Sequence, residues 1–195
     1  MILYLHGFRS SPLSAKSQLM AQVMQERGQA DLFVCPQLPA EPKQAIQLCL
    51  DLAQQAQQAG QEICLMGSSL GGYYATYLAQ ELDCRAVLIN PSIYAARDLS
   101  TQLDVRTQFH TDAPFHFSAA YVKQLADLFV PVLKQPERYF LLAGKRDEVL
   151  DWQEMQARFI GAKQLIVDDQ DHAFADLGRY LPEVLDFIFT PGKTS

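Results

Sequence analysis

Short runs of hydrophobic residues alternate along the chain with longer segments in which hydrophobic residues recur every three or four positions. Runs this short have the length of buried strands, whereas the longer spacing places apolar side chains on one face of a helix. Such an alternation predicts a parallel sheet with helices on both faces. The predicted strands are Ile2 to His6, Leu32 to Cys35, Ile63 to Gly67, Ala86 to Asn90, Tyr139 to Ala143 and Gln164 to Val167.

Two segments between the predicted strands have the spacing of amphipathic helices. One apolar face is formed by Leu19, Met20, Val23 and Met24. The other is formed by Ala45, Leu48, Cys49, Leu52, Ala53 and Ala56. We expect a last helix to begin at Pro182, because Gly178 interrupts the pattern before it and the fixed φ of proline suits the first helical position. The tail from Pro191 to Ser195 is expected to fray.

The segment from Pro91 to about Pro136 departs from this alternation. It contains several prolines, among them Pro114 and Pro131, and an aromatic cluster of Phe109, Phe115, Phe117 and Tyr121. We expect an insertion that lies over the edge of the sheet. Because the chain shows no internal repeat and no second regime of composition, residues 1–195 are predicted to form one domain with this insertion at 91–136.

The composition is that of a globular protein and excludes some partners. Hydrophobic residues make up 49% of the 195 residues and charged residues 19%, unlike a disordered chain. The formal net charge of -6 lacks the basic excess that binding to nucleic acid or to an anionic membrane requires. We therefore expect a small-molecule ligand and no nucleic-acid partner.

Neither a membrane span nor an export signal is expected. Apolar runs such as that around Phe140 to Ala143 are far shorter than the roughly 20 residues of a spanning helix. The amino terminus enters an apolar run directly, without a basic flank or a cleavage site. The cysteines lie too far apart in the sequence for zinc-binding or redox pairs. We expect a cytoplasmic protein with buried free thiols and no metal or other cofactor.

The most specific motif is Gly67-Ser68-Ser69-Leu70-Gly71, which matches Gly-x-Ser-x-Gly and falls between a predicted strand and a predicted helix. A serine on this turn has strained backbone angles and an exposed hydroxyl, and small residues on either side allow the turn to close. We predict Ser69 as a nucleophile, with Gly67 and Gly71 as the elbow glycines and Ser68 as a bystander. The Leu70 N–H, at a helix N-terminus, is one candidate to stabilise an oxyanion.

A serine nucleophile needs a base, normally a histidine that a carboxylate orients. Among four histidines, His172 follows the last predicted strand and lies at the end of the sheet where the elbow must lie. His6 ends the first strand, while His110 and His116 belong to the insertion. We predict His172 as the base.

The carboxylate is expected between the serine and the histidine in chain order. Asp147 fits best, because it follows the fifth predicted strand through a short loop that can face His172. The rival carboxylates are Glu148, Asp151, Asp168, Asp169 and Asp171.

A second oxyanion donor is expected where the first strand ends. The Phe8 N–H occupies the position from which this architecture supplies that donor. Gly7 allows the backbone to approach a substrate closely, and we expect His6 to brace the loop rather than transfer protons.

These blocks together resemble the α/β-hydrolase superfamily over essentially the whole chain, and more narrowly the small bacterial YqiA-type esterases. The blocks are Tyr4-Leu5-His6-Gly7-Phe8, Pro36-Gln37-Leu38-Pro39, Gly67 to Thr76, Asn90-Pro91, Asp147 to Asp151 and Asp171-His172-Ala173-Phe174. The resemblance places the nucleophile at Ser69, the acid at Asp147 and the base at His172.

The resemblance also implies a three-layer α/β fold reduced to six parallel strands, because the antiparallel hairpin with which larger relatives begin is missing. The implied strand order is second, first, third, fourth, fifth, sixth, with the site at the carboxyl ends of the strands. The implied activity is cofactor-independent hydrolysis of small carboxylic esters. A thioesterase or amide hydrolase with the same triad is the alternative within enzymes. A catalytically idle scaffold that binds a partner or ligand is the alternative outside them.

Overall fold

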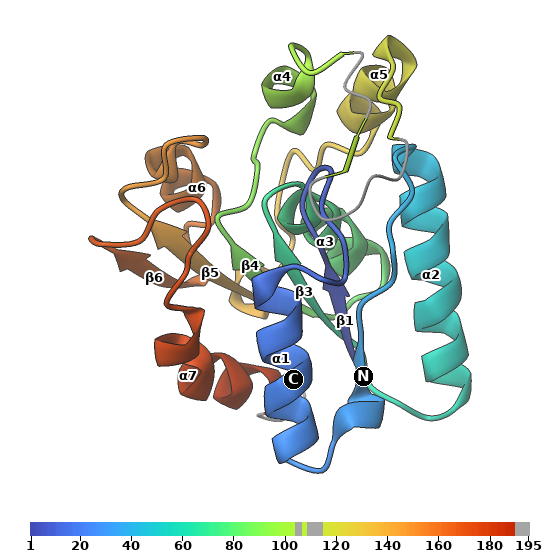
Figure 1. Ribbon diagram of the computed structural model, residues 1–195, viewed down its shortest axis with the longest axis vertical. Coiled ribbons are helices and arrows are strands. Elements are labelled where there is room, and N and C mark those ends of the chain that lie inside the picture. Colours follow the sequence, from blue (N-terminus) through green and yellow to red (C-terminus); the bar gives the residue numbers. More distant parts are fainter. Residues whose placement is uncertain (104–106, 109–114, 190–195) are drawn as a thin grey trace.

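The computed structural model describes residues 1–103, 107–108 and 115–189, which form one parallel six-stranded sheet between two layers of helices (Figure 1). The strand order is β2-β1-β3-β4-β5-β6, and every neighbouring pair is parallel. The strands are β1 (Ile2–Leu5), β2 (Phe33–Val34), β3 (Cys64–Ser68), β4 (Arg85–Ile89), β5 (Tyr139–Gly144) and β6 (Lys163–Val167). The predicted strands and their order are confirmed.

Alternate residues of each strand serve the two faces of the sheet, as the pleat requires. Ile2 and Tyr4 belong to a core shared with α1 (Ala15–Glu26) and α7 (Leu177–Phe189). Leu3 and Leu5 belong to a second core on the opposite face. That core is shared with α2 (Pro42–Gln58), α3 (Leu70–Glu81) and α6 (Trp152–Arg158). Strands covered on both faces carry the nearly continuous apolar runs seen in the sequence.

The helix faces predicted from spacing are the buried ones. Met20 and Met24 of α1 are fully buried. On α2, Ala45, Cys49 and Ala53 are fully buried, while the glutamine-rich face is exposed. Within the described part of the chain, no helix is long and apolar enough to cross a membrane.

The prediction that the last helix begins at Pro182 is wrong. The helix begins at Leu177, and both Gly178 and Pro182 lie inside it. Pro182 lacks the N–H that would bond to the carbonyl four residues earlier. The turn before it forms because Leu177 and Leu181 continue the buried stripe of Leu185 and Ile188, so tertiary packing outweighs the local cost of the proline.

The chain between β4 and β5 carries α4 (Ala95–Leu99) and α5 (Ala119–Asp127), which lie beyond the carboxyl ends of the strands rather than over a sheet edge (Figure 1). Single 3₁₀ turns, Ala30–Leu32 and Pro136–Arg138, precede β2 and β5. Phe115 and Phe117 reach the loop after β1, where each packs edge-on against Phe8 at 5.2 and 5.0 Å between ring centroids. Of the predicted insertion features, Phe109, His110 and Pro114 lie outside the described residues.

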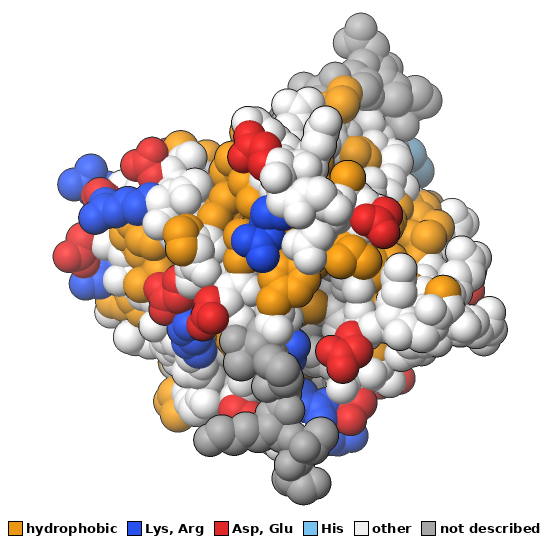
Figure 2. All heavy atoms as spheres, turned by 90° about the horizontal axis from the view of Figure 1, so that it is seen from below, with side chains coloured by type: hydrophobic (Ala, Val, Ile, Leu, Met, Phe, Trp, Pro, Cys, Tyr) orange, Lys and Arg blue, Asp and Glu red, His pale blue; other side chains and the backbone are white. Residues whose placement is uncertain are grey.

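The amino ends of the strands lie at the opposite end of the molecule (Figure 1), and Figure 2 shows the molecule from that side. A hollow of about 240 Å³ lies there, lined largely by apolar side chains of Met1, Ile2, Leu32, Ile63, Cys64, Ile188 and Phe189. Arg85 of β4 donates to the carbonyls of Phe187 and Ile188 and so pairs groups that the end of α7 leaves free.

All four cysteines are free thiols. Burial raises the pKa of the Cys49, Cys64 and Cys84 thiols to about 12, which keeps them protonated and unreactive at neutral pH. Cys49 and Cys64 are buried and act as small core residues, whereas Cys35 and Cys84 are half-buried, so the expectation of buried thiols holds for two of the four.

Candidate active site

Ser69 lies on a sharp turn between β3, which ends at Ser68, and α3, which begins at Leu70. Its φ of 56° and ψ of -123° fall in a region that side-chain-bearing residues rarely adopt. The turn depends on two glycines: a Cβ on Gly67 would overlap the Gly71 carbonyl, and a Cβ on Gly71 would overlap the Leu5 carbonyl of β1. The structure places Gly67, Ser69 and Gly71 together on this one turn between β3 and α3.

The end of β4 holds this turn from its other side. The Ser69 N–H donates to the Ile89 carbonyl at 3.1 Å, and the Ser92 N–H donates to the Ser69 carbonyl at 3.1 Å. The Ser69 carbonyl also accepts the Gly72 N–H at 2.9 Å, which begins the helix. These bonds hold the strained backbone, so the Cα–Cβ bond of Ser69 keeps one direction relative to the sheet.

The structure brings together Ser69, His172 and Asp147, which lie far apart in the sequence. The Ser69 Oγ lies 3.2 Å from His172 Nε2. The His172 Nδ1 lies 2.9 Å from Asp147 Oδ2 and 3.0 Å from Oδ1. A proton on Nδ1, facing the carboxylate, leaves Nε2 able to accept the serine proton. Such an arrangement allows a serine hydroxyl to pass its proton to a histidine that a carboxylate orients.

The side chain of Asp147, in the loop after β5, is fully buried. Its Oδ1 accepts the N–H groups of Val149 and Leu150 at 2.9 and 2.8 Å, so the carboxylate is fixed independently of His172. The Arg146 N–H donates to the Gln170 carbonyl at 3.0 Å, which joins this loop to the loop that carries His172.

The rival carboxylates each have another partner. Asp151 caps α6 by accepting the Gln153 N–H, and Glu148 accepts the backbone N–H of His172 at 3.1 Å. The remaining pairs are Asp168 with Lys145, Asp169 with the Gln170 amide, and Asp171 with the Phe174 N–H. Glu148 therefore supports the loop that carries His172. The sequence did not predict this role, because it shows only that Glu148 is next to Asp147.

The candidate oxyanion donors lie beside the elbow. A Cβ on Gly7 would lie 3.8 Å from the Ser69 Oγ, so the loop after β1 runs close to the hydroxyl. Leu70 is the first residue of α3, and its N–H therefore has no partner in a preceding helical turn. His6 is buried; its Nδ1 contacts the Gly7 carbonyl at 3.0 Å and its Nε2 accepts the Leu38 N–H at 3.0 Å. These contacts brace the Gly7–Phe8 loop.

Lys16 adds a positive charge next to the histidine loop. Its ammonium donates to the Ala173 carbonyl, one residue after His172. Burial lowers the pKa of Lys16, and the nearby carboxylates of Asp171 and Asp147 partly oppose that shift. The Lys16 side chain thus contacts the loop that carries His172.

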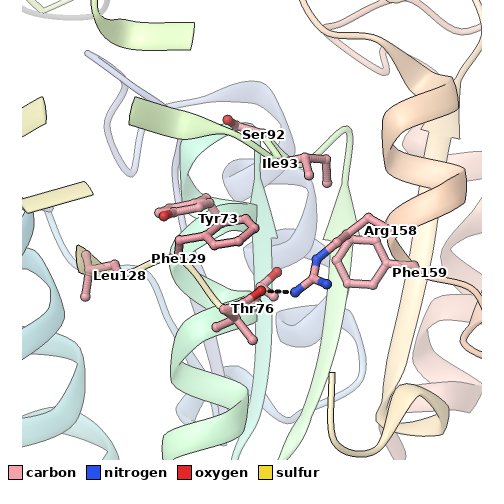
Figure 3. Close-up of a pocket in the computed structure, with 9 residues that line it drawn as sticks. Tyr73, Thr76, Ser92, Ile93, Leu128, Phe129, Arg158 and Phe159 are labelled. Atoms are coloured by element: carbon pink, nitrogen blue, oxygen red, sulfur yellow. Dashed lines mark hydrogen bonds between the residues drawn. The ribbon is translucent and has the colours of Figure 1, made fainter. Parts of the chain in front are cut away.

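Two small hollows lie on either side of α3. One, of about 10 Å³, adjoins the oxyanion candidates and is lined by His6, Gly7, Phe8, Arg9, Leu38, Pro39, Ala40, Leu70, Tyr74 and Phe115. A hollow of this size has room for about one water molecule. The other, also about 10 Å³, lies behind the elbow, where Tyr73, Ile93 and Phe129 converge on Arg158 (Figure 3). The Arg158 guanidinium donates to the Val130 and Pro131 carbonyls, so this second hollow is lined by satisfied polar groups.

The exposed His116 takes no part in this site, and His110 lies outside the described residues. Among the residues that the structure describes, no three His, Cys, Asp or Glu side chains lie close enough together to hold a metal ion.

Comparison with known protein families assigns the chain to one of them. The model of the uncharacterised protein family UPF0227 matches residues 1–189. The chain belongs to the UPF0227 family, which is the YqiA-type family. UPF0227 proteins of Yersinia pseudotuberculosis and Yersinia pestis are 28% identical to it over 191 residues, covering 96% of this chain and 98% of theirs.

Solved structures establish the fold class of this UPF0227 member as α/β-hydrolase. Mouse alpha/beta hydrolase domain-containing protein 10 superposes with a TM-score of 0.71 at 14% identity, covering 95% of this chain and 89% of that protein. Est1E from Butyrivibrio proteoclasticus, solved with ferulic acid bound, gives 0.68 at 12% identity, covering 94% and 85%. The Pyrococcus furiosus esterase Pf2001 gives 0.64 at 18% identity, covering 95% and 78%. The expected fold class is confirmed.

Proposed function

We propose that this protein is a serine hydrolase that cleaves small carboxylic esters through an acyl-enzyme. The observation that carries the proposal is the continuous hydrogen-bonded line from the Ser69 hydroxyl through His172 to the buried Asp147. Ser69 attacks the ester carbonyl carbon as His172 Nε2 takes its proton. The N–H groups of Phe8 and Leu70 stabilise the oxyanion, and Asp147 stays ionised beside the imidazolium.

His172 then returns its proton to the leaving alcohol, and the alkoxy group departs as the free alcohol. A water molecule loses a proton to the same imidazole and attacks the acyl-enzyme, which releases the acid and restores the Ser69 hydroxyl. The mechanism needs no cofactor. The ester class is supported by a structural neighbour that is itself named an esterase, Pf2001 of Pyrococcus furiosus.

The test is hydrolysis of p-nitrophenyl acetate and butyrate by the protein and by Ser69→Ala, with fluorophosphonate labelling read by intact mass. Ser68→Ala is the matched control, because it removes a neighbouring hydroxyl from the same turn. We expect labelling and turnover in the parent and in Ser68→Ala, and a loss of about 10⁴-fold or more in Ser69→Ala. An unlabelled parent, or activity that survives Ser69→Ala, would refute the proposal and favour a binding scaffold. Turnover of thioesters in strong preference to esters would move the assignment to a thioesterase.

A further inference from the structure

Asn90 lies at the end of β4 and has no exposed surface. Its φ of 41° belongs to the left-handed region, where asparagine is among the few side-chain-bearing residues found regularly. Its backbone N–H donates to the Leu142 carbonyl of β5 at 2.9 Å, so the residue is fixed to the neighbouring strand. A buried polar side chain in this backbone conformation needs specific partners.

The Asn90 side chain joins the two loops that carry the acid and the base. Its Oδ1 accepts the Gly144 N–H at 2.8 Å, where β5 ends and the loop to Asp147 begins. Its Nδ2 donates to the Asp171 carbonyl at 2.8 Å and to the His172 carbonyl at 3.2 Å. One primary amide therefore supplies an acceptor to one loop and both of its donors to the other, a combination that neither a carboxylate nor a hydroxyl provides.

Side chains from two other loops hold the backbone of His172. Glu148 accepts its N–H and Asn90 donates to its carbonyl, so the peptide groups on both sides of the His172 Cα are held by side chains that follow β5 and β4. The direction of the Cα–Cβ bond, and with it the position of Nε2, follows from these two peptide groups. A displacement of about 1 Å between reacting groups can cost about 100-fold in rate.

We propose that Asn90 is a positioning residue for His172: its buried amide holds the base loop so that Nε2 faces the Ser69 hydroxyl while Nδ1 faces Asp147. The inference rests on the proposed function and extends it to a residue that touches none of the reacting atoms. In this inference the side-chain amide of Asn90 holds the His172 loop, whereas its backbone, with positive φ, forms the turn after β4.

Two substitutions test different parts of this role. Asn90→Asp keeps the shape and the acceptor for Gly144, but it replaces the donors to the histidine loop with an oxygen that repels the two carbonyls. Asn90→Gly removes the whole amide and tolerates the positive φ without strain. Val184→Ala, in the core on the α7 side of the sheet, is the control for a loss of stability that leaves the loops intact.

We expect both Asn90 variants to lose about 100-fold in kcat for p-nitrophenyl acetate with KM unchanged within threefold, and to react with fluorophosphonate correspondingly slowly. The assays are run well below each variant's melting temperature, and Val184→Ala should melt lower yet keep kcat. Asn90 variants that melt lower but keep kcat would overturn the inference. Variants that do not fold at all would also overturn it. In both cases the amide would support the fold and not the position of His172. A parent without Ser69-dependent turnover would instead overturn the proposed function.

Discussion

The Asp147→Asn substitution would reverse the proton arrangement of His172 without changing the shape of the site. In the structure, Asp147 Oδ1 accepts two backbone N–H groups, from Val149 at 2.9 Å and Leu150 at 2.8 Å. An asparagine would keep its carbonyl oxygen there, since an NH₂ group cannot accept these bonds. Its NH₂ group would then occupy the position of Oδ2, 2.9 Å from His172 Nδ1.

An NH₂ group at that distance makes Nδ1 an acceptor and moves the imidazole proton to Nε2. The nitrogen that faces Ser69 would then carry a proton and could not take another. The wrong tautomer in a serine triad costs about 10⁴-fold in turnover. At 1.36 kcal/mol per factor of ten, this is about 5 kcal/mol of transition-state stabilisation.

The assay is kcat and KM for p-nitrophenyl acetate between pH 6 and 9, together with thermal melting. Asp168→Asn is the matched control, because Asp168 lies in the histidine loop but its exposed carboxylate pairs with Lys145. We expect the control to stay within about threefold of the parent. If Asp147→Asn also kept a tenth or more of the parental kcat, the tautomer argument would be wrong and another carboxylate would have to orient His172.

Two further predictions concern the elbow and the loop that holds the base. Gly71→Ala should abolish activity or folding, because its Cβ would overlap the Leu5 carbonyl. Gly178→Ala should fold and melt slightly higher, because the atom nearest to its Cβ would be 3.9 Å away. Equal behaviour of the two alanine variants by circular dichroism and turnover would contradict this prediction. The pKa of Glu148 is lowered by hydrogen bonds from its own N–H and that of His172, so its carboxylate stabilises the folded state above its ordinary pKa of 4.5 and ceases to do so as the pH falls through the lowered value. The parent should therefore melt above Glu148→Gln at pH 7 and converge with it on acidification, and a difference in melting temperature independent of pH would speak against this.

Local pattern was enough to predict the sheet and the three candidate site residues. The strands are buried on both faces, so each appears in the sequence as a continuous apolar run. Ser69 could be found because its turn demands glycines at two fixed positions. His172 and Asp147 followed from chain order, since the carboxyl ends of parallel strands meet at one edge of the sheet.

The start of α7 could not be predicted in the same way. Proline signals a helix start by its own backbone preference, but Pro182 lies inside the helix because Leu177 and Leu181 are buried against the sheet. The information that decides this lies in the residues packed against α7 and not in the helix itself. A local rule therefore fails where the tertiary contribution is larger than the local one.

The roles of Asn90 and Glu148 on the His172 loop could not be predicted from the sequence, for a related reason. Asn90 and Glu148 act on backbone groups of the histidine loop, and any sequence in that loop presents the same N–H and C=O groups. Gly144 is a third example, because a Cβ there would overlap the Gln170 carbonyl where the acid and base loops meet. In the sequence, each of these contacts is marked by one partner only: an asparagine, a glutamate or a glycine that ends or follows a strand. Residues of these types also occur at such positions for unrelated reasons, so they do not by themselves indicate the contact. The candidate nucleophile Ser69 is thus predicted by a local motif, whereas the contacts that hold the His172 loop come from residues at the ends of neighbouring strands and are seen only in the folded structure.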